Sequence, residues 1–208
     1  NDARTSGGAD NTTKSFGVPV VERVLSDAYD AANRYSDSEP LRRHQLAEIR
    51  TSGQQPQIAT ALAQLGLNLV KQGNWTEAEP VLRECLEIRE KQSPNAWQTF
   101  NAQSLLGGAL LGQQKYADAE PLLLKGYEGM LAREATIPTK GRIRLIEAIE
   151  RLVEHFESTD NREKSAKFRA ELKQRRAAGN SANMTGVRIK FAMASVVPRI
   201  VTGRLRTG

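Results

Sequence analysis

Apolar positions recur along much of the chain at the three- and four-residue spacing of amphipathic helices. Between Pro56 and Gln72, the apolar and small residues fall on one side of a helix with 3.6 residues per turn. They are Ala59, Leu62, Ala63, Leu65, Gly66, Leu69 and Val70. In the first helix the expected stripe is formed by Val20, Val24, Leu25 and Tyr29. The pattern predicts an all-α fold of paired helices joined by short turns.

The predicted helix pairs occupy residues 18–51, 56–91, 94–133 and 142–177. Ser93 followed by Pro94 is expected to provide the N-cap and the first residue of the fifth helix. Residues 1–17 are rich in Gly, Ser, Thr, Asn and Asp, and such a composition predicts disorder. The domain of helix pairs is therefore expected to span residues 18–178, with disordered segments at both ends.

The middle of the chain contains one pattern twice, at a constant offset of 41 residues. In the first helix of each copy, Leu65, Gly66 and Leu69 recur as Leu106, Gly107 and Leu110. In the second helix, Trp75, Ala78, Glu79, Pro80 and Leu82 recur as Tyr116, Ala119, Glu120, Pro121 and Leu123. A weaker copy places Tyr35, Glu39 and Pro40 at an offset of 40. A fixed offset of this kind indicates an array of helical repeats.

Small residues at recurring positions indicate where the helices of a pair cross. Two helix axes approach to about 8–10 Å only where the facing side chains are small. We expect the two recurring glycines and the two recurring alanines to provide these crossings, and Trp75 and Tyr116 to fill the wedge between neighbouring pairs. Any amphipathic hairpin needs leucines at helical spacing, but it does not need Gly, an aromatic residue and Ala at one offset.

The Leu-Gly pair at 65–66, followed by Trp75, Ala78 and Glu79 and repeated 41 residues later, resembles a tetratricopeptide repeat. The offset is longer than the usual repeat of about 34 residues. With the sequence LEIREK after the second helix, it resembles the longer kinesin-light-chain type. Residues 96–130 further resemble the arrays attached to bacterial serine/threonine protein kinases. The resemblance implies a right-handed superhelical array of about four pairs that acts as a cytoplasmic protein-interaction scaffold.

The fourth pair departs from the repeat pattern. Val153 occupies the position of the small glycine, and Ser165 occupies that of the alanine. Tight packing is therefore less expected here, and a capping role for the last pair is favoured.

In the resembled family the first helix of each pair lines the concave side, which implies a groove for an extended or helical peptide. Its positions correspond here to Thr60, Gln64, Leu67, Lys71, Asn101, Ser104, Leu105, Glu147, Glu150 and Glu154. A peptide spanning this groove would need a carboxylate near Lys71 and cations near Glu150 and Glu154. The alternative is that these residues form ordinary solvated faces.

The net charge of +6 is concentrated at the C-terminal end, since eight Lys or Arg and no Asp or Glu follow Leu172. Residues 179–208 are expected to form a disordered tail. A different function remains open, in which this basic tail binds nucleic acid or an anionic membrane surface. The alternation of Val187, Ile189 and Phe191 with basic residues has a strand-like period. No apolar run approaches the roughly 18 residues of a membrane-spanning helix.

The sequence contains no recognisable catalytic set. His44 and His155 lack Ser, Cys or carboxylate partners at motif spacing, and Cys85 stands at a packing position. The glycine-rich loop, H-R-D and D-F-G motifs of protein kinases are missing, so a kinase domain would lie outside this chain. We therefore expect no enzyme activity, no cofactor and no bound metal. The single cysteine favours a reducing compartment, in agreement with a cytoplasmic location.

Overall fold

The computed structural model describes residues 17–194, and side chains within residues 20–178. This part of the chain is all-α, as predicted, and contains no strand. Its helices are α1 (Gly17–Ala31), α2 (Tyr35–Ser52), α3 (Gln55–Lys71), α4 (Trp75–Gln92), α5 (Trp97–Gly112), α6 (Tyr116–Leu131), α7 (Ile143–Ser158) and α8 (Arg162–Ala194). Two 3-10 turns, Glu134–Thr136 and Thr139–Gly141, join α6 to α7.

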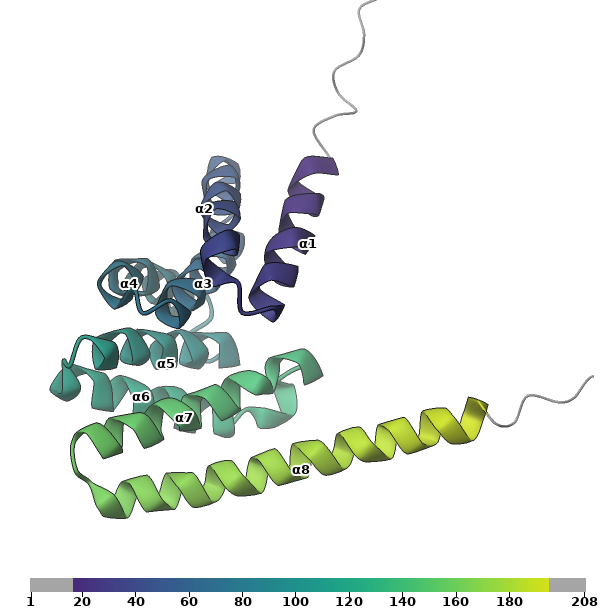
Figure 1. Ribbon diagram of the computed structural model, residues 1–208. Coiled ribbons are helices and arrows are strands. Elements are labelled where there is room, and N and C mark those ends of the chain that lie inside the picture. The colour runs from purple at the N-terminus through teal and green to yellow at the C-terminus, as the bar shows by residue number, and fades with distance from the viewer. Residues whose placement is uncertain (1–16, 195–208) are drawn as a thin grey trace, which may run out of the picture.

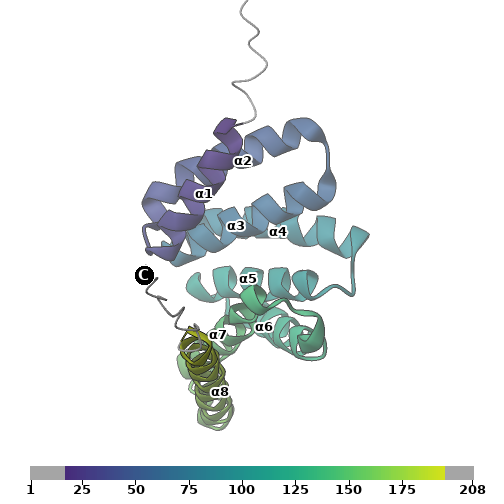
Figure 2. The same cartoon turned by 90° about the vertical axis from the view of Figure 1, so that its right-hand side faces the viewer.

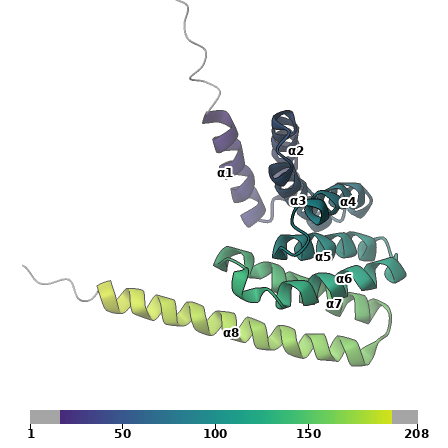
Figure 3. The same cartoon turned by 180° about the vertical axis from the view of Figure 1, so that it is seen from behind.

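Successive helices form antiparallel pairs, and the pairs stack on one another (Figure 1). The view in Figure 2 shows the stack from α1 and α2 at one end to α7 and α8 at the other. Each second helix packs against the first helix of the next pair, so that α2 contacts α3, α4 contacts α5 and α6 contacts α7. Helix α1 lies at the edge of the array with α2 alongside it, as Figures 1 and 3 both show.

The two central pairs cross at glycine, as the sequence predicted. A Cβ atom on Gly66 would lie 2.6 Å from Cγ of Leu82, and one on Gly107 would lie 2.8 Å from Cγ of Leu123. Glycine and leucine are 16 residues apart in both pairs, so the repeated residues make a repeated contact. The recurring alanines are fully buried beside this crossing. Close packing of this kind leaves no room for a larger side chain at either glycine.

The recurring aromatic residues lie between neighbouring pairs, as expected. Trp75 packs over Gly112 of the next pair, where an added Cβ would overlap the indole ring. Tyr116 makes an edge-to-face contact with His155 of the next pair, with ring centroids 6.1 Å apart. Trp75 nevertheless remains 40% exposed, so one side of its indole faces solvent.

A recurring glutamate also links each pair to the next. Glu79 accepts a hydrogen bond from Gln113 at 2.9 Å, and Glu120 lies 3.4 Å from Nε2 of His155. In the first pair, Glu39 accepts the corresponding bond from Gln72 at 2.7 Å. The weak N-terminal copy of the pattern thus makes the same contact between pairs as the central copies.

The last pair is joined by aromatic stacking rather than by a glycine crossing. Phe156 of α7 stacks on Phe168 of α8 with centroids 5.7 Å apart, and Tyr127 of α6 meets Phe168 edge-on at the same distance. Val153 is half-buried against the core. The departure of this pair from the repeat pattern therefore corresponds to a different mode of packing.

Three expectations about helix boundaries and faces were wrong. Helix α5 begins at Trp97, because Ser93 and Pro94 form a turn in which the Ser93 carbonyl accepts hydrogen bonds from Ala96 N and Thr99 Oγ1. The last helix does not end near residue 177 but continues to Ala194, so the strand-like segment 187–191 has a helical backbone.

The expected stripe of α1 is the third difference, because its valines and Leu25 face solvent. Disorder was predicted for residues 1–17 and 179–208. Residues 1–16 and 195–208 lie outside the described residues, whereas residues 179–194 have a helical backbone as part of α8.

Candidate functional site

Three adjoining cavities follow α3. The first, of about 650 Å³, lies among α1, α2 and α3 and is lined by Val20, Ile49 and Ala61 among others. The second, of about 340 Å³, lies among α1, α3 and α7 and shares Gln64 with the first. The third, of about 260 Å³, extends along α7 towards Trp75. Because neighbouring cavities share residues, the three form one continuous surface across the stacked pairs.

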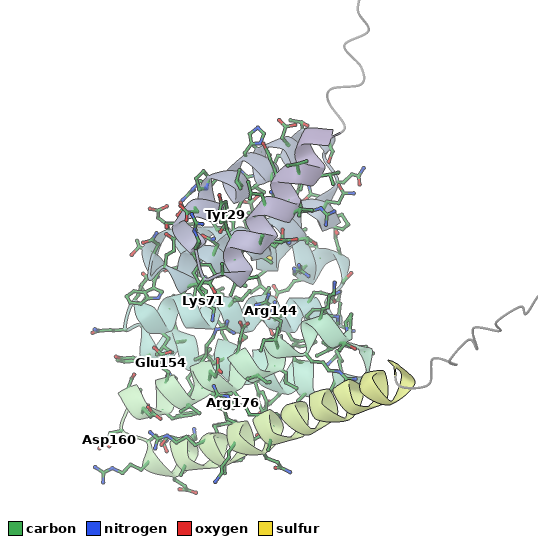
Figure 4. The ribbon with its side chains drawn as sticks, turned by 45° about the vertical axis from the view of Figure 1, so that its right-hand side comes forward. Tyr29, Lys71, Arg144, Glu154, Asp160 and Arg176 are labelled. Atoms are coloured by element: carbon green, nitrogen blue, oxygen red, sulfur yellow. The ribbon has the colours of Figure 1, made fainter. Side chains whose placement is uncertain are left out.

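A cluster of ion pairs separates the second and third cavities. Glu147 of α7 lies 2.8 Å from Arg144, 3.6 Å from Lys71 of α3 and 3.8 Å from Arg151. Figure 4 shows Lys71 and Arg144 where α3 and α7 approach one another. Burial alone would raise the pKa of the Glu147 carboxyl, but Arg144 and Arg151 hold that pKa below its usual value. Glu147 is therefore charged at neutral pH and ties α7 to α3.

Arg151 closes the surface over α5. Its side chain packs on Gly108, where a Cβ would lie 2.8 Å from the Arg151 Cδ atom. Its Nη1 donates a hydrogen bond of 3.1 Å to the hydroxyl of Ser104. The backbone of α5 is thus shielded in the middle of the array, and an approaching ligand would meet Arg151 instead of Ser104.

The third cavity ends in an aromatic face and an exposed carboxylate. Trp75 contributes an aromatic ring to the lining of this cavity, and α7 contributes Glu150 and Glu154. Glu150 forms an ion pair of 2.6 Å with Arg176. The side chain of Glu154 is exposed and makes no hydrogen bond or ion pair within residues 20–178. An indole beside such a carboxylate favours a cationic group.

Seven of the ten predicted site residues line these cavities. They are Thr60, Gln64, Leu67, Lys71, Glu147, Glu150 and Glu154. The three predicted residues of α5 do not: Ser104 and Leu105 are buried, and Asn101 is half-buried. The carbonyl oxygen of the Asn101 side chain is buried without a hydrogen-bond partner in the described part of the chain.

Two contributions to the site were missed by the sequence analysis. The sequence pattern predicts Trp75 only in the wedge between pairs, but this residue also lines the third cavity from the start of α4. Asp27 and Asp30 line the second cavity and pair with Arg42 at 2.6 and 2.7 Å. Their three-residue spacing on one helical face was the available signal.

Clustered metal ligands and membrane-spanning helices are both absent from the residues that the structure describes. No group of three or more His, Cys, Asp or Glu within them could hold a metal ion. None of their helices is long and apolar enough to cross a membrane.

Comparison with known proteins agrees with this architecture. Residues 57–132 match the family described as tetratricopeptide repeat. The crystal structure of BtubC (BKLC) from P. vanneervenii is similar, with a TM-score of 0.56 at 15% identity, covering 90% of this chain and 86% of that chain.

Two further crystal structures are of a Podosopora anserina protein described as a kinesin light chain with nearly identical TPR-like repeats. They align with TM-scores of 0.46 and, for a variant form of that protein, 0.47. Their identities are 12% and 11%, and the alignments cover 76% and 77% of this chain and 95% of each of those chains. No curated protein matches the chain in sequence.

Proposed function

Residues 57–132 are tetratricopeptide repeats, and from this premise we propose that the chain is a protein-interaction scaffold that binds a partner peptide along α3 and α7. The observation that supports this proposal is the continuity of the three cavities, which contain seven of the ten residues expected in the groove. A segment of extended peptide could place successive side chains into successive cavities, as in other groove-binding proteins.

The two ends of this surface favour different side chains. The cavity of about 650 Å³ has an aliphatic floor of Val20, Ile49 and Ala61, which suits a large apolar side chain. At the opposite end, Trp75 and Glu154 suit Arg or Lys. Lys71 lies between the ends and is already paired with Glu147, so a carboxylate on the peptide is not required there.

Selection from a random peptide library displayed on phage would test this proposal. We expect the full chain to enrich peptides with Arg or Lys several residues away from an aliphatic or aromatic residue. A synthetic copy of an enriched peptide should bind the Glu154→Gln variant about tenfold more weakly, in line with the loss of one charge contact. Isothermal titration calorimetry would measure this difference.

The matched control is Glu163→Gln, because Glu163 is also exposed but lies at the start of α8, outside the three cavities. This variant should bind the peptide as the unchanged chain does. Equal binding by the Glu154 variant, or the absence of any enriched sequence, would contradict the proposed groove.

A second candidate function uses the C-terminal end. The chain after Leu172 contains eight basic and no acidic residues, and the backbone of α8 remains helical to Ala194. Binding to DNA or to anionic vesicles that weakens strongly with salt, and disappears when 179–208 are deleted, would favour this adaptor function over the peptide groove. The association with a bacterial protein kinase rests on sequence resemblance and remains part of the proposal.

A further inference from the structure

Helix α1 turns its apolar side towards solvent. Val20, Val21, Val24 and Leu25 are 52%, 64%, 58% and 40% exposed, and Ala28 beside them is exposed as well. Among residues 20–178 only three other large apolar side chains are this exposed, and they belong to separate helices. Contiguous apolar surface of this kind on a soluble domain indicates a binding face.

The opposite side of α1, which packs on α2, is polar. Ser26 is fully buried and accepts a hydrogen bond from Gln45 of α2. Asp30 pairs with Arg42 at 2.7 Å and accepts a hydrogen bond from Ser38. The helix is therefore amphipathic in the reverse sense, with its polar side inside the pair and its apolar side outside.

The repeats themselves indicate what covers such a face elsewhere in the array. The offset of 40 relates three residues of this face, Val21, Leu25 and Ala28, to positions on α3. The offset of 41 then relates those positions on α3 to positions on α5. The corresponding residues, all at most 4% exposed, are Ala61, Leu65, Asn68, Ala102, Leu106 and Ala109. There the preceding second helix, α2 or α4, packs alongside the first helix. The uncovered face of α1 thus has the position and chemistry of a helix-packing surface.

We propose that α1 pairs with α1 of a second copy of this chain to form a two-fold symmetric dimer. The complement to this face must itself be apolar. At the far end of the array, the exposed side chains of α8 up to residue 178 are charged, Gln or Ala, so head-to-tail stacking on this part of α8 would place charged side chains against the apolar face. The same face on a second copy is the matching apolar surface in the described part of the chain, and a self-complementary patch gives an isologous contact.

The order of side chains favours antiparallel helices. About a point between Val24 and Leu25, antiparallel pairing places Val21 opposite Ala28 of the second copy, and Val24 opposite Leu25. Large side chains then meet small ones at the ends of the contact. Parallel pairing would instead oppose two alanines and leave a gap. The stripe contains no charged residue, so no charge loses its hydration in the contact.

Sedimentation equilibrium of the full chain over a range of concentrations would test the dimer. The unchanged chain should show a reversible monomer–dimer equilibrium. Val24→Lys should raise the dissociation constant of the dimer by about 100-fold or more, because two lysines would meet across the two-fold axis. Val24 is 58% exposed and Lys is a good helix former, so the monomer should keep its helix content by circular dichroism. The matched control is Leu131→Lys, which changes an exposed aliphatic residue on α6. The chain with this substitution should dimerise as the unchanged chain does.

Disulfide trapping would test the orientation. In the antiparallel dimer, the double variant V21C/A28C should form a covalent dimer under mild oxidation, whereas V21C and A28C alone should not. In a single variant, the two introduced cysteines, one in each copy, would be about 10 Å apart along the helix axes, which is too far for a disulfide. Cys85 is fully buried and should not interfere. A monomer at every concentration, normal dimerisation of Val24→Lys, or cross-linking of the single variants would overturn the proposal.

Discussion

The first helix pair and the two central pairs share one layout but use opposite chemistry where their helices cross. In the central pairs, Gly66 meets Leu82 and Gly107 meets Leu123. The corresponding residues of the first pair are Ser26 and Arg42, and Arg42 is 3% exposed between Asp27 and Asp30. The comparison shows that one repeat geometry can be maintained either by close apolar packing or by a buried ion pair.

These two solutions should respond differently to mutation. Close packing has no tolerance for added volume, whereas a buried ion pair depends on both partners being present. The first pair also directs its polar groups inwards, which leaves the apolar side of α1 outside. The polar crossing of the first pair and the exposed apolar face of α1 thus have one cause: the polar side of α1, not its apolar side, packs on α2.

The largest effect is expected at the central crossing. Gly107→Val would place a branched side chain against Leu123, whose Cγ and backbone N would lie 2.8 and 3.1 Å from the new Cβ. We expect the free energy of unfolding to fall by about 3 kcal/mol, as for severe overpacking. Urea denaturation followed by circular dichroism would measure it, with Ala170→Val on the exposed side of α8 as control. A loss below about 1 kcal/mol would show that the crossing is not tightly packed.

The ion pair of the first helix pair should show a loss that a second mutation recovers. Asp30→Ala leaves the buried guanidinium of Arg42 with Asp27, which is 51% exposed at its side chain. We expect a loss of about 2–3 kcal/mol in the free energy of unfolding. The double variant Asp30→Ala/Arg42→Leu copies the apolar chemistry of the central pairs and should be more stable than Asp30→Ala alone. Urea denaturation of these two variants and of Arg42→Leu alone would show simple additivity if the ion pair had no energetic role.

The central crossing could be predicted from sequence because the same residues recur at one offset, and a recurring contact is the simplest cause. The inverted face of α1 could not be predicted in this way. An apolar stripe indicates that a helix has a packing side, but α2 accepts the polar side of α1 because Arg42 needs Asp27 and Asp30. Hydrophobic periodicity does not contain that ion-pairing information.

The residues predicted for the groove coincide with the lining of the cavities on α3 and α7 but not on α5. The positions on α5 were transferred from α3 at the constant offset of 41, but this transfer does not report what the next pair places over α5. The consequence is visible at Ser104, which occupies a groove position in sequence but is covered by Arg151 from α7. The third cavity is lined by both Trp75 of the second pair and Glu154 of the fourth pair, and no local sequence pattern reports that these two residues share one cavity.

The recurring glutamate allows the pH dependence of stability to be compared between pairs, at Glu79 in the second pair and at Glu39 in the first. Hydrogen bonds from Lys115 and Arg83 hold the pKa of the Glu79 carboxyl at about 2, below the ordinary value of 4.5. For Glu39 in the first pair, burial raises the pKa, but Gln72 and Arg43 lower it more. A lowered folded-state pKa stabilises the fold above the unfolded-state value, and this contribution disappears as the pH falls from about 4.5 to 2.

Glu79→Gln should therefore lower the free energy of unfolding by about 1 kcal/mol at pH 7, since its cationic partners are partly exposed. The difference from the unchanged chain should decline between pH 4.5 and 2. Glu39→Gln should show a smaller pH dependence, because its partner across the pairs, Gln72, is neutral. Thermal unfolding over this pH range would measure both variants. A constant difference at all pH values would contradict the role of charge at Glu79.

The smallest effect is expected at the surface between the first pair and the next. Arg50 of α2 lies 2.6 Å from Glu84 of α4, and both side chains are about half exposed. Water competes with such a pair, so Arg50→Gln should lower the free energy of unfolding by at most about 0.5 kcal/mol, and this loss should vanish at about 1 M salt. Urea denaturation at low and high salt would measure it. A larger, salt-independent loss would mean that the first pair is attached to the array through this contact, and not mainly through Arg42 and the buried Asn68 that hydrogen-bonds to Ser38.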